Sequence, residues 1–496
     1  MSPYLKNMAA MLGQSSVQRI AGMLSTMVMA RCLGSAGFGL YSIAFNTGST
    51  AYSMLRLGVD AALHVQTAQP LDSDAARQTT SRLLGAGFLL LSSAGALGAA
   101  GLVLAADTLA TALYGRSDVA VYLRIGGVLV LLQCMAQFAY VVMMGLHRFK
   151  QYAAFSALNS IGLSAVLSTA AWLGDVHWAL GGLVGMQVLA LWIARIQVTH
   201  ALHANQVHID FADIRLNVVR LLRLGFPFYA AGLLTAPIAY LLQASLTKSV
   251  GLDAMGGMRV ITSLTTLIGF VPNAVAAVMI SHLTRARGVD PQDFAAGAIY
   301  NIKVLWSLSL LACVAMFAIL PWLVTVLFGH AYSSYVVAAG LASFSALAGC
   351  VIGVVINVAL SSHRVDIIVK ASFFQAITWY ASGWLLIDRL GLTAYYVAEA
   401  LGSTAALAVA FWLSRGWRLR HGFSLDRFAT LIATSATFAV LVLWPLGTQP
   451  STVATGRLPI SLLLFVAIGC ALYRMDGDLR DGVKAFMETR SLRKPR

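Results

Sequence analysis

Residues 83–106 read LLGAGFLLLSSAGALGAAGLVLAA, a run of 24 residues without Asp, Glu, Lys or Arg. As a helix this run measures about 36 Å, enough to cross a hydrocarbon core about 30 Å thick. Similar uncharged runs occupy residues 125–146, 153–173 and 178–194, and no Asp, Glu, Lys or Arg occurs between residues 304 and 362. The sequence therefore predicts several membrane-spanning helices.

The composition of the whole chain agrees with this prediction. Hydrophobic residues make up 59% of the 496 residues, charged residues make up 11%, and the mean hydropathy is +0.78. Soluble domains carry roughly 25% charged residues, because water must wet their surface. The composition excludes a soluble enzyme, a secreted disulfide scaffold and a disordered chain, and it predicts an all-α polytopic membrane protein.

The apolar runs predict about fourteen transmembrane helices. The uncharged segment 304–362 is too long for one helix, and residues 328–334 (FGHAYSS) divide it into a helical hairpin. The expected helices lie near residues 12–33, 38–58, 80–105, 121–145, 153–173, 178–198, 223–247, 254–282, 300–326, 335–360, 367–387, 392–413, 428–446 and 458–473.

The 34 Lys and Arg residues outnumber the 19 Asp and Glu residues, which gives a net charge of +15. Basic connections alternate with nearly uncharged ones, as the positive-inside rule predicts, so both termini are expected in the cytoplasm. We expect no nucleic-acid partner, because the chain has no basic domain interleaved with aromatic residues. The basic connections carry Arg77, Arg82, Arg148, Lys150, Arg195, Arg215, Arg220, Arg223, Arg285, Arg287, Arg364, Lys370, Arg415, Arg418, Arg420 and Arg427.

We expect neither a bound cofactor nor a cleaved signal peptide. The five cysteines are isolated in apolar stretches, so we expect neither a disulfide nor a metal site. No P-loop or dinucleotide-binding motif follows a strand, so ATP-driven transport is not encoded in the chain. Gln18 and Arg19 interrupt the first apolar stretch, which is unlike the apolar region of a signal peptide.

The chain repeats itself at an offset of about 214–217 residues. Such a constant offset predicts two six-helix lobes in the same orientation, related by a pseudo-twofold axis along the membrane normal. The matched pairs are Arg31-x-x-Gly34-x-x-x-x-Gly39 with Lys248-x-x-Gly251-x-x-x-x-Gly256, Leu113-Tyr114-Gly115 with Leu327-Phe328-Gly329, Cys134 with Cys350, and His147-Arg148 with His363-Arg364.

Four regions follow from this repeat. They are an N-terminal lobe (1–205), a C-terminal lobe (206–425), helices thirteen and fourteen (426–473) and a basic cytoplasmic tail (474–496). Residues 210–223 alternate apolar and basic positions at helical spacing, which predicts an amphipathic helix that lies on the cytoplasmic leaflet and joins the lobes. A solvated connector helix is the alternative.

Short motifs in order and spacing along nearly the whole chain carry a family resemblance. Residues 30–42 (ARCLGSAGFGLYS), residues 224–227 (LGFP) and the Leu327-Phe328-Gly329 turn followed by Tyr332 resemble the polysaccharide-transporter (Wzx-type flippase) family. That family belongs to the multidrug/oligosaccharidyl-lipid/polysaccharide exporter superfamily. The resemblance implies a flippase of the bacterial inner membrane, not an enzyme. Its expected substrate is an undecaprenyl-diphosphate-linked oligosaccharide unit for exopolysaccharide or O-antigen assembly, moved to the periplasmic leaflet by alternating access. Membrane lipids, a polysaccharide polymerase and other assembly proteins are the candidate partners.

Candidate site residues also follow from the resemblance. Related lipid II flippases place arginines of helices one, two and eight around a central cavity, and this chain has Arg19, Arg56 and Arg259 in those helices. A buried arginine costs about 2.5–3.5 kcal/mol on insertion scales, and a diphosphate is a group that its guanidinium fork can bind. Snorkelling to the headgroups is the alternative. The glycines Gly34, Gly39, Gly251 and Gly256 lie at equivalent outer turns and are expected to form a gate.

Two acids are candidates for ion coupling. Glu399 is the only glutamate before the tail, and Asp60 stands four residues after Arg56, close enough to pair with it. A hydrogen-bonded core carboxyl is the alternative for Glu399. Many relatives have an acid in helix seven, but residues 240–243 (YLLQ) have none, which argues against a sodium site there.

The polar residues within the helices have two interpretations. They either hydrogen-bond between helices or bind sugar hydroxyls, and the aromatic residues either stack on sugars or lie in interfacial belts. The polar residues are Gln14, Asn46, Gln133, Gln137, Asn159, Gln187, Gln243, Asn273, Asn357 and Gln375.

Three other functions remain open. A multidrug or cation antiporter needs acidic lumen residues, whereas these helices carry basic ones. A lipid II flippase would use the same diphosphate chemistry. A membrane polysaccharide polymerase or glycosyltransferase would need a catalytic base or a large external loop, and neither is evident.

Overall fold

The computed structural model describes residues 3–67, 71–269, 309–313, 315–316, 319–361 and 365–413. Within these ranges every regular element is a helix. This follows from the apolar sequence, because a backbone in lipid must satisfy its own hydrogen bonds. Helices thirteen and fourteen, the basic tail, Asn273, Arg285, Arg287, Arg364, Arg415, Arg418, Arg420 and Arg427 lie outside the described residues.

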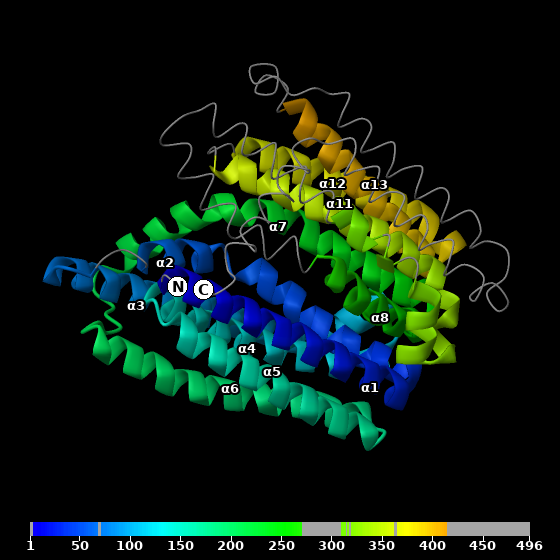
Figure 1. Cartoon of the computed structure of the whole chain (residues 1–496), viewed down its shortest axis with the longest axis horizontal. Helices are drawn as coiled ribbons and strands as arrows, with labels where there is room; N and C mark the ends of the chain where they lie inside the picture. Colours follow the sequence, from blue (N-terminus) through cyan, green and yellow to red (C-terminus); the bar gives the residue numbers. More distant parts are fainter. Residues whose placement is uncertain are drawn as a thin grey trace, which may run out of the picture. The chain divides into compact units, whose positions relative to one another are not determined.

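Apart from the short α2, each described helix overlaps a predicted one, and α8 is described as far as Ile268 of the predicted range 254–282 (Figure 1). In the described part of the chain, seven helical stretches are long and apolar enough to cross a membrane. The elements are α1 (Pro3–Leu55), α2 (Val59–Thr67), α3 (Asp74–Leu109), a π-helical turn (Ala110–Tyr114), α4 (Ala120–Gly145), α5 (Phe149–Trp172), α6 (Val176–Ala204), α7 (Ile214–Val250), α8 (Leu252–Ile268), an apolar helix (Ile319–Phe328), a 3₁₀ turn (His330–Tyr335), α11 (Val336–Ser361), α12 (Val365–Leu390) and α13 (Leu392–Leu413).

Helix α1 contains both the first and the second predicted helix, and Gly34 divides it into two arms. The first arm runs parallel to α5, since Gln14 contacts Ser156 and Ala21 contacts Ser164. The second arm, which continues to Leu55, runs parallel to α4 in the same way. Because α4 and α5 are antiparallel neighbours, the two arms form the predicted hairpin.

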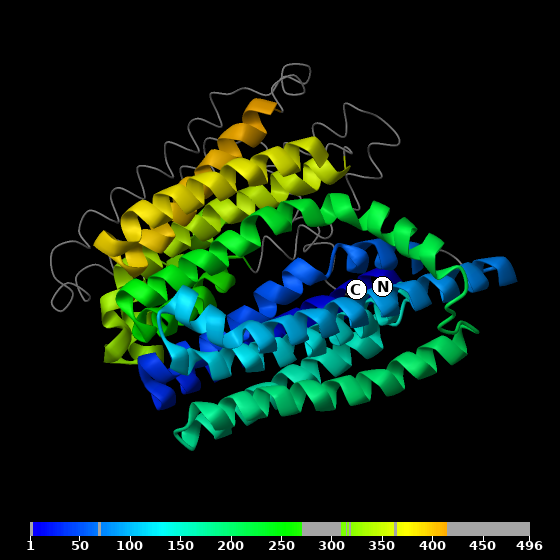
Figure 2. The same cartoon turned by 180° about the vertical axis from the view of Figure 1, so that it is seen from behind.

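The described contacts divide the chain into two units. One unit holds Met1–Ser263 with Gly383–Tyr395, and the other holds Leu264–Ser382 with Tyr396–Arg496. Helices α1 to α6 pack around each other in the first unit, where α4, α5 and α6 lie side by side in both views (Figures 1 and 2). Its core cluster includes Leu63, Leu84 and Val142. The repeat-based boundary at residue 205 stays a prediction.

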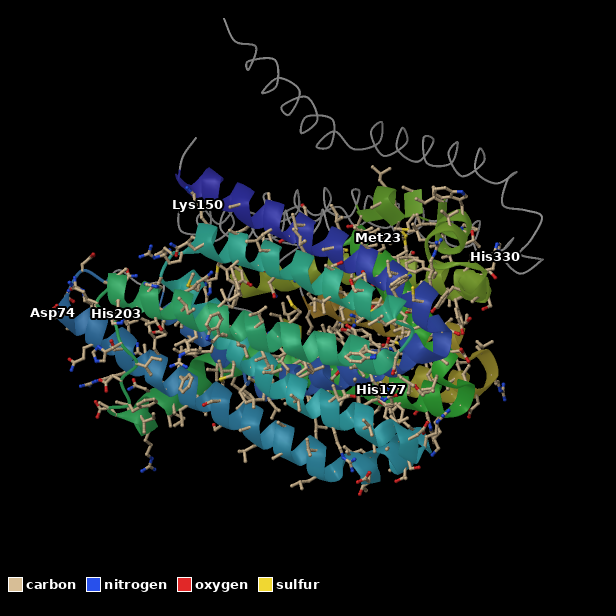
Figure 3. All side chains as sticks on the ribbon, turned by 90° about the horizontal axis from the view of Figure 1, so that it is seen from below. Met23, Asp74, Lys150, His177, His203 and His330 are labelled. Atoms are coloured by element: carbon tan, nitrogen blue, oxygen red, sulfur yellow. The ribbon has the colours of Figure 1, made fainter. Side chains whose placement is uncertain are left out.

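One end of the first unit bears most of its basic connections. Asp74, Lys150 and His203 lie together at one end of the helices, and His177 lies at the other end (Figure 3). We call the first of these the basic end. There the Arg82 guanidinium pairs with Asp213 at 2.6 Å, which ties α3 to the segment before α7.

The predicted amphipathic segment 210–223 joins the predicted helix 223–247 in one element, and its place on the leaflet stays a prediction. Helix α7 begins at Ile214 and continues to Val250, because Gly225 and Pro227 do not interrupt it. Leu221 is fully buried in the core cluster of the first unit, and Val218 and Leu222 pack against it. The apolar stripe of this segment therefore packs against protein, while Arg215, Arg220 and Arg223 stay exposed.

The repeat is visible in where helices begin. Helix α4 begins at Ala120 and α11 at Val336, 216 residues later, and the same offset separates α5 from α12 and α6 from α13. Tyr114 and Phe328 each end a helix, and each is followed by a 3₁₀ turn. The predicted break of segment 304–362 at residues 328–334 is confirmed.

Candidate functional site

The second arm of α1 crosses α8 at two glycines that the repeat relates to each other. A β-carbon on Gly39 would overlap the carbonyl oxygen of Leu252, and a β-carbon on Gly256 would overlap the carbonyl oxygen of Ser35. Ser35 and Leu252 are themselves repeat equivalents, so the crossing is reciprocal. The Ser35 hydroxyl also donates to the Asp253 carboxylate.

Gly34 and Gly251 begin the two crossing segments with nearly the same backbone conformation. Their φ and ψ angles are 68° and 179° for Gly34 and 109° and 178° for Gly251. Side chains with a β-carbon rarely adopt such positive φ values, so both turns require glycine. The four glycines predicted as a gate thus meet at one place, although gating itself remains untested.

The basic end of the same arm makes a second close contact, with α7. Gly58 and Gly225 approach so closely that a β-carbon on either would overlap the carbonyl oxygen of the other. The Tyr229 hydroxyl donates to the Met54 carbonyl oxygen nearby. Gly225 belongs to the LGFP motif, so this motif places a glycine where two backbones touch.

Between these contacts, three hydroxyls connect the arm to other helices. Tyr240 on α7 lies 3.0 Å from Thr47 Oγ1, and the Tyr114 hydroxyl donates to the Tyr240 hydroxyl at 3.1 Å. The π-helical turn Ala110–Tyr114 presents Tyr114, and such turns often occur at functional sites. Sequence reasoning did not single out Tyr114 as a site residue, although the Leu113-Tyr114-Gly115 repeat contains it.

An amide network lies beside these hydroxyls. Asn46 Nδ2 donates to Gln243 Oε1 at 3.1 Å, and Gln243 Nε2 donates to the Tyr395 hydroxyl at 3.4 Å. The amide of Gln243, in the acid-free segment 240–243, is thus bonded by neutral groups. These contacts show that Asn46 and Gln243 hydrogen-bond between helices, as one of the two interpretations predicted.

Arg259 on α8 lies against an aromatic ladder on the second arm. Its guanidinium carbon is 4.2 Å from the centroid of the Phe45 ring. Phe45 stacks on Tyr41, and Tyr41 stacks on Phe38. A cation over a ring face is stabilised by the ring quadrupole, so the Phe45 ring stabilises and orients the Arg259 guanidinium.

Arg56 stands at the basic end of the second arm, where α1 gives way to α2. Its Nη1 donates to Asp60 Oδ2 at 3.0 Å, which confirms the predicted ion pair. Asp60 is 10% exposed and also accepts from Gln137 Nε2 at 3.3 Å. Arg56 is 39% exposed, but its Nε is buried and has no hydrogen-bond partner among the described residues.

The three predicted arginines occupy different depths along the helices. Arg56 is eleven residues beyond Phe45, the partner of Arg259, which separates the two levels by about 16 Å. Arg19 is half-buried on the first arm, the arm that packs against α5. Their convergence on one cavity therefore stays a prediction.

Glu399 is half-buried on α13 in the second unit. No hydrogen bond or ion pair joins its side chain to the part of the chain that the structure describes. Nearby, Gly402 packs closely on the backbone of Gln375 and the side chain of Trp379. Among the described residues, no three His, Cys, Asp or Glu side chains are placed to hold a metal ion.

The sequence profile of the polysaccharide biosynthesis proteins matches residues 4–281, more than half of the chain and all of the crossing described above. The chain belongs to this polysaccharide biosynthesis protein family. No curated protein matches its sequence significantly.

Solved structures show the fold of this family member. Lipid II flippase MurJ in an inward closed conformation is similar over 93% of this chain and 98% of its own, with a TM-score of 0.72 and 10% identity. The inward-facing conformation of a multidrug resistance MATE family transporter of the MOP superfamily covers 86% and 99%, with a TM-score of 0.67 and 15% identity. A MOP superfamily transporter from Pyrococcus furiosus covers 85% and 96%, with a TM-score of 0.57 and 15% identity.

At these identities the likeness shows the fold alone. It is that of the multidrug/oligosaccharidyl-lipid/polysaccharide exporter superfamily, whose members named here are flippases or transporters. This polysaccharide biosynthesis protein is therefore a multi-pass membrane protein, and its described regular elements are all helices.

Proposed function

We propose that this protein flips undecaprenyl-diphosphate-linked oligosaccharide units from the cytoplasmic to the periplasmic leaflet of the bacterial inner membrane, with both termini in the cytoplasm. The units would feed exopolysaccharide or O-antigen assembly, with a polymerase as a downstream partner. Family membership supports a lipid-linked saccharide as the substrate class. The fold shared with a lipid II flippase supports translocation and not bond-making chemistry.

The observation that carries the proposal is the unpaired donor of Arg56. Its Nε is buried without a partner among the described residues, while Nη1 is held by Asp60. A buried unpaired donor costs about 1–3 kcal/mol, more in a charged group, and an anionic ligand would remove that cost. Phosphate oxygens suit it, because a guanidinium donates to them through two parallel bonds.

Arg259 and Arg19 extend the same chemistry toward the opposite end of the helices. Arg259 over Phe45 keeps a cation about 16 Å beyond Arg56, at the level where the α1 and α8 segments cross. A diphosphate entering at the basic end would pass from one cation to the next. Separation of the α1 and α8 segments at Gly39 and Gly256 would then release the diphosphate. In this proposal the four glycines form the gate for alternating access.

Energy for the cycle would come from the membrane potential and from one titrating acid. An inside-negative potential favours outward movement of each negative charge by about 2.3 kcal/mol per 100 mV. Asp60 is already bound by Arg56 and Gln137. Glu399 is therefore the better candidate for a coupling proton. Glu399→Gln should slow cycling and leave substrate binding intact.

The test is flipping of a polyprenyl-diphosphate-linked oligosaccharide by the purified protein in liposomes. Arg56→Gln should lower the rate about tenfold or more, since charge-assisted hydrogen bonds contribute about 1.5–3 kcal/mol. Arg56→Lys should fall between Gln and Arg, because Lys cannot bind bidentately. Arg116→Gln is the matched control, because Arg116 is exposed and pairs with Asp118 in a turn.

Wild-type flipping by an Arg19→Ala, Arg56→Ala, Arg259→Ala triple variant would contradict the diphosphate site. Parallel assays with lipid II and with a cationic dye separate the other superfamily activities. Faster flipping of lipid II than of the oligosaccharide lipid would replace the proposed substrate. Proton-driven dye efflux without any flipping would support an antiporter instead.

A further inference from the structure

A cavity lies inside the first unit, where one face of each of α4, α5 and α6 converges. Its volume is about 110 Å³, several times what one water molecule needs. Ligand pockets for whole drug-sized molecules measure about 300–1,000 Å³, so this cavity suits a single ring. Ala139, Ala190 and Ala194 line it, and their small side chains leave the space open.

The cavity lining is uncharged, and polar side chains stand among its apolar ones. Carboxamides come from Asn159 on α5 and from Gln187 and Gln197 on α6, and hydroxyls come from Tyr140 and Tyr152. None of the described residues that line the cavity is Asp, Glu, Lys, Arg or His. A diphosphate or an ion would therefore meet no counter-charge in the lining.

The three carboxamides differ from the Asn46–Gln243 pair. Gln243 and Asn46 bond to each other, whereas no described residue hydrogen-bonds to the side chains of Asn159, Gln187 or Gln197. Half-buried amides at membrane depth need partners, because lipid supplies none. These three thus present donors and acceptors to whatever occupies the cavity.

Two tyrosines add an aromatic wall. The rings of Tyr140 and Tyr152 meet edge to face with their centroids 4.9 Å apart. An aromatic ring can pack against the C–H face of a sugar, and amides beside it can hydrogen-bond to the sugar hydroxyls. An acyl chain would leave the amides unpaired, so the lining disfavours it.

The cavity lies near the basic end of the unit. Tyr152 follows the first residue of α5 by about 5 Å along the helix and Asn159 by about 15 Å. Lys150, at the start of α5, marks that end in Figure 3. A headgroup that arrives at the basic end can therefore reach the cavity without crossing the membrane.

We infer that this cavity is a binding site for one uncharged sugar ring, held by the carboxamides of Asn159, Gln187 and Gln197 against the Tyr140–Tyr152 pair. Its assignment to the transported lipid rests on the proposed function, in which the sugar would bind here while the diphosphate binds arginine. A glycolipid of the bilayer is the other source of the same ring.

Protection of a reporter cysteine tests binding directly. In a cysteine-free variant in phosphatidylcholine nanodiscs, Ala194→Cys places a thiol in the cavity, and Ile196→Cys places one on the exposed side of α6. Saturating methyl glycosides should slow N-ethylmaleimide labelling of Ala194→Cys at least threefold and leave Ile196→Cys unchanged. Gln187→Met or Asn159→Leu should remove the protection. Absence of protection by every hexoside and N-acetylhexosaminide would overturn the inference.

Thermal unfolding without sugar separates binding from structural support. Gln187→Met should leave the melting temperature unchanged or raise it, because the amide has no described partner to lose. Gln243→Met is the matched control and should lower it, because that amide bonds to Asn46 and Tyr395. A drop for Gln187→Met as large as the control's would show a structural amide and overturn the inference.

Two further protection experiments identify the molecule that carries the sugar ring. Protection by a polyprenyl-diphosphate-linked sugar supports the transported lipid, and protection by a glycosyl diacylglycerol alone supports a bilayer glycolipid. Failures of the two proposals are distinguishable. Normal flipping without protection overturns the sugar site and leaves the flippase. Protection without flipping of any oligosaccharide lipid overturns the flippase and leaves the site.

Discussion

Helices α4, α5 and α6 enclose a cavity. At some matching positions their repeat counterparts α11, α12 and α13 carry bulkier or less polar residues, although Gln375 keeps a carboxamide at the position of Asn159. Tyr152 and Gln187 of the first repeat correspond to Ile368 and Ser403 of the second, both buried. Leu163 corresponds to Trp379, which is buried against Gly402. The helix starts keep a constant offset of 216 residues, so the backbone plan is conserved while the side chains decide what space remains.

This contrast shows that a repeat can preserve a backbone contact in both copies while the side chains around a cavity differ. The glycine crossing uses both repeats equally, since Gly39 and Gly256 perform the same contact on each other's segment. The described cavity is lined by residues of the first repeat. Symmetric positions should therefore respond alike to substitution, and specialised positions should respond differently.

The largest effect is expected at the symmetric crossing. Gly39→Val and Gly256→Val should each lower stability by about 3 kcal/mol or more, the upper range of overpacking, because each side chain meets a backbone oxygen. Melting temperatures in detergent measure this effect. Gly101→Val is the control, since a β-carbon there meets nothing. Clearly unequal losses of stability for Gly39→Val and Gly256→Val would contradict the equivalence of the two positions.

A smaller effect should distinguish a cavity-lining alanine of the first repeat from its buried counterpart in the second. Ala406→Leu should destabilise the protein by about 1–3 kcal/mol, because Ala406 is fully buried in the second repeat. Its counterpart Ala190→Leu should be tolerated, because the new side chain enters the cavity. Thermal unfolding of both variants is the measurement. Equal destabilisation would mean that the two bundles are packed alike.

Tyr114→Phe gives the first repeat the residue type that the second repeat has at the equivalent position, Phe328. The loss of its hydrogen bond to Tyr240 should cost about 0.5–1.5 kcal/mol, the usual net value of such a bond. Tyr380→Phe, at an exposed position, should cost nothing measurable. Denaturation midpoints compare the two, and identical midpoints would show that the Tyr114 hydroxyl does not bind the helices together.

The smallest effect is expected at the start of α6. Asp175 caps this helix, while its counterpart before α13 is Gly391. Hydrogen bonds from the backbone N–H and the ring of His177 hold the pKa of the Asp175 carboxyl below its usual value of 3.8. The stabilisation is therefore complete above that value and is lost as the pH falls through the lowered pKa.

Asp175→Gly should accordingly lower the melting temperature slightly at pH 6. The difference from the wild-type protein should disappear in strongly acidic buffer, where both carry no charge at this position. A difference that persists unchanged at low pH would assign the effect to backbone flexibility of the new glycine instead of the cap.

Much of the fold could be predicted because lipid imposes strict rules on sequence. Residues 83–106 must be a helix, since an uncharged run of that length has no other way to satisfy its backbone in hydrocarbon. The segment 210–223 was predicted less well. Its periodicity correctly indicated a helix with one apolar face, but periodicity cannot say whether lipid or protein covers that face. Packing of Leu221 in the core cluster decided it.

The candidate site was predictable only in part. The i,i+4 spacing of Arg56 and Asp60 was enough to predict their ion pair, because a helix brings such positions together. The position of Arg259 over Phe45 could not be predicted, since these residues are 214 apart in sequence and on different helices. The same holds for Tyr114 and Tyr240, whose pairing depends on how three helices pack.

The sequence by itself determined the membrane environment, the helix positions, the repeat and the glycines at equivalent turns, because each depends on local hydrophobicity, spacing or backbone freedom. Only the tertiary structure decided which polar residues support the fold and which remain open to a ligand. Gln243 and Gln187 are the same residue type in similar apolar helices, yet one bonds across helices and the other faces a cavity. That difference depends on the neighbours that distant parts of the chain bring within hydrogen-bonding distance.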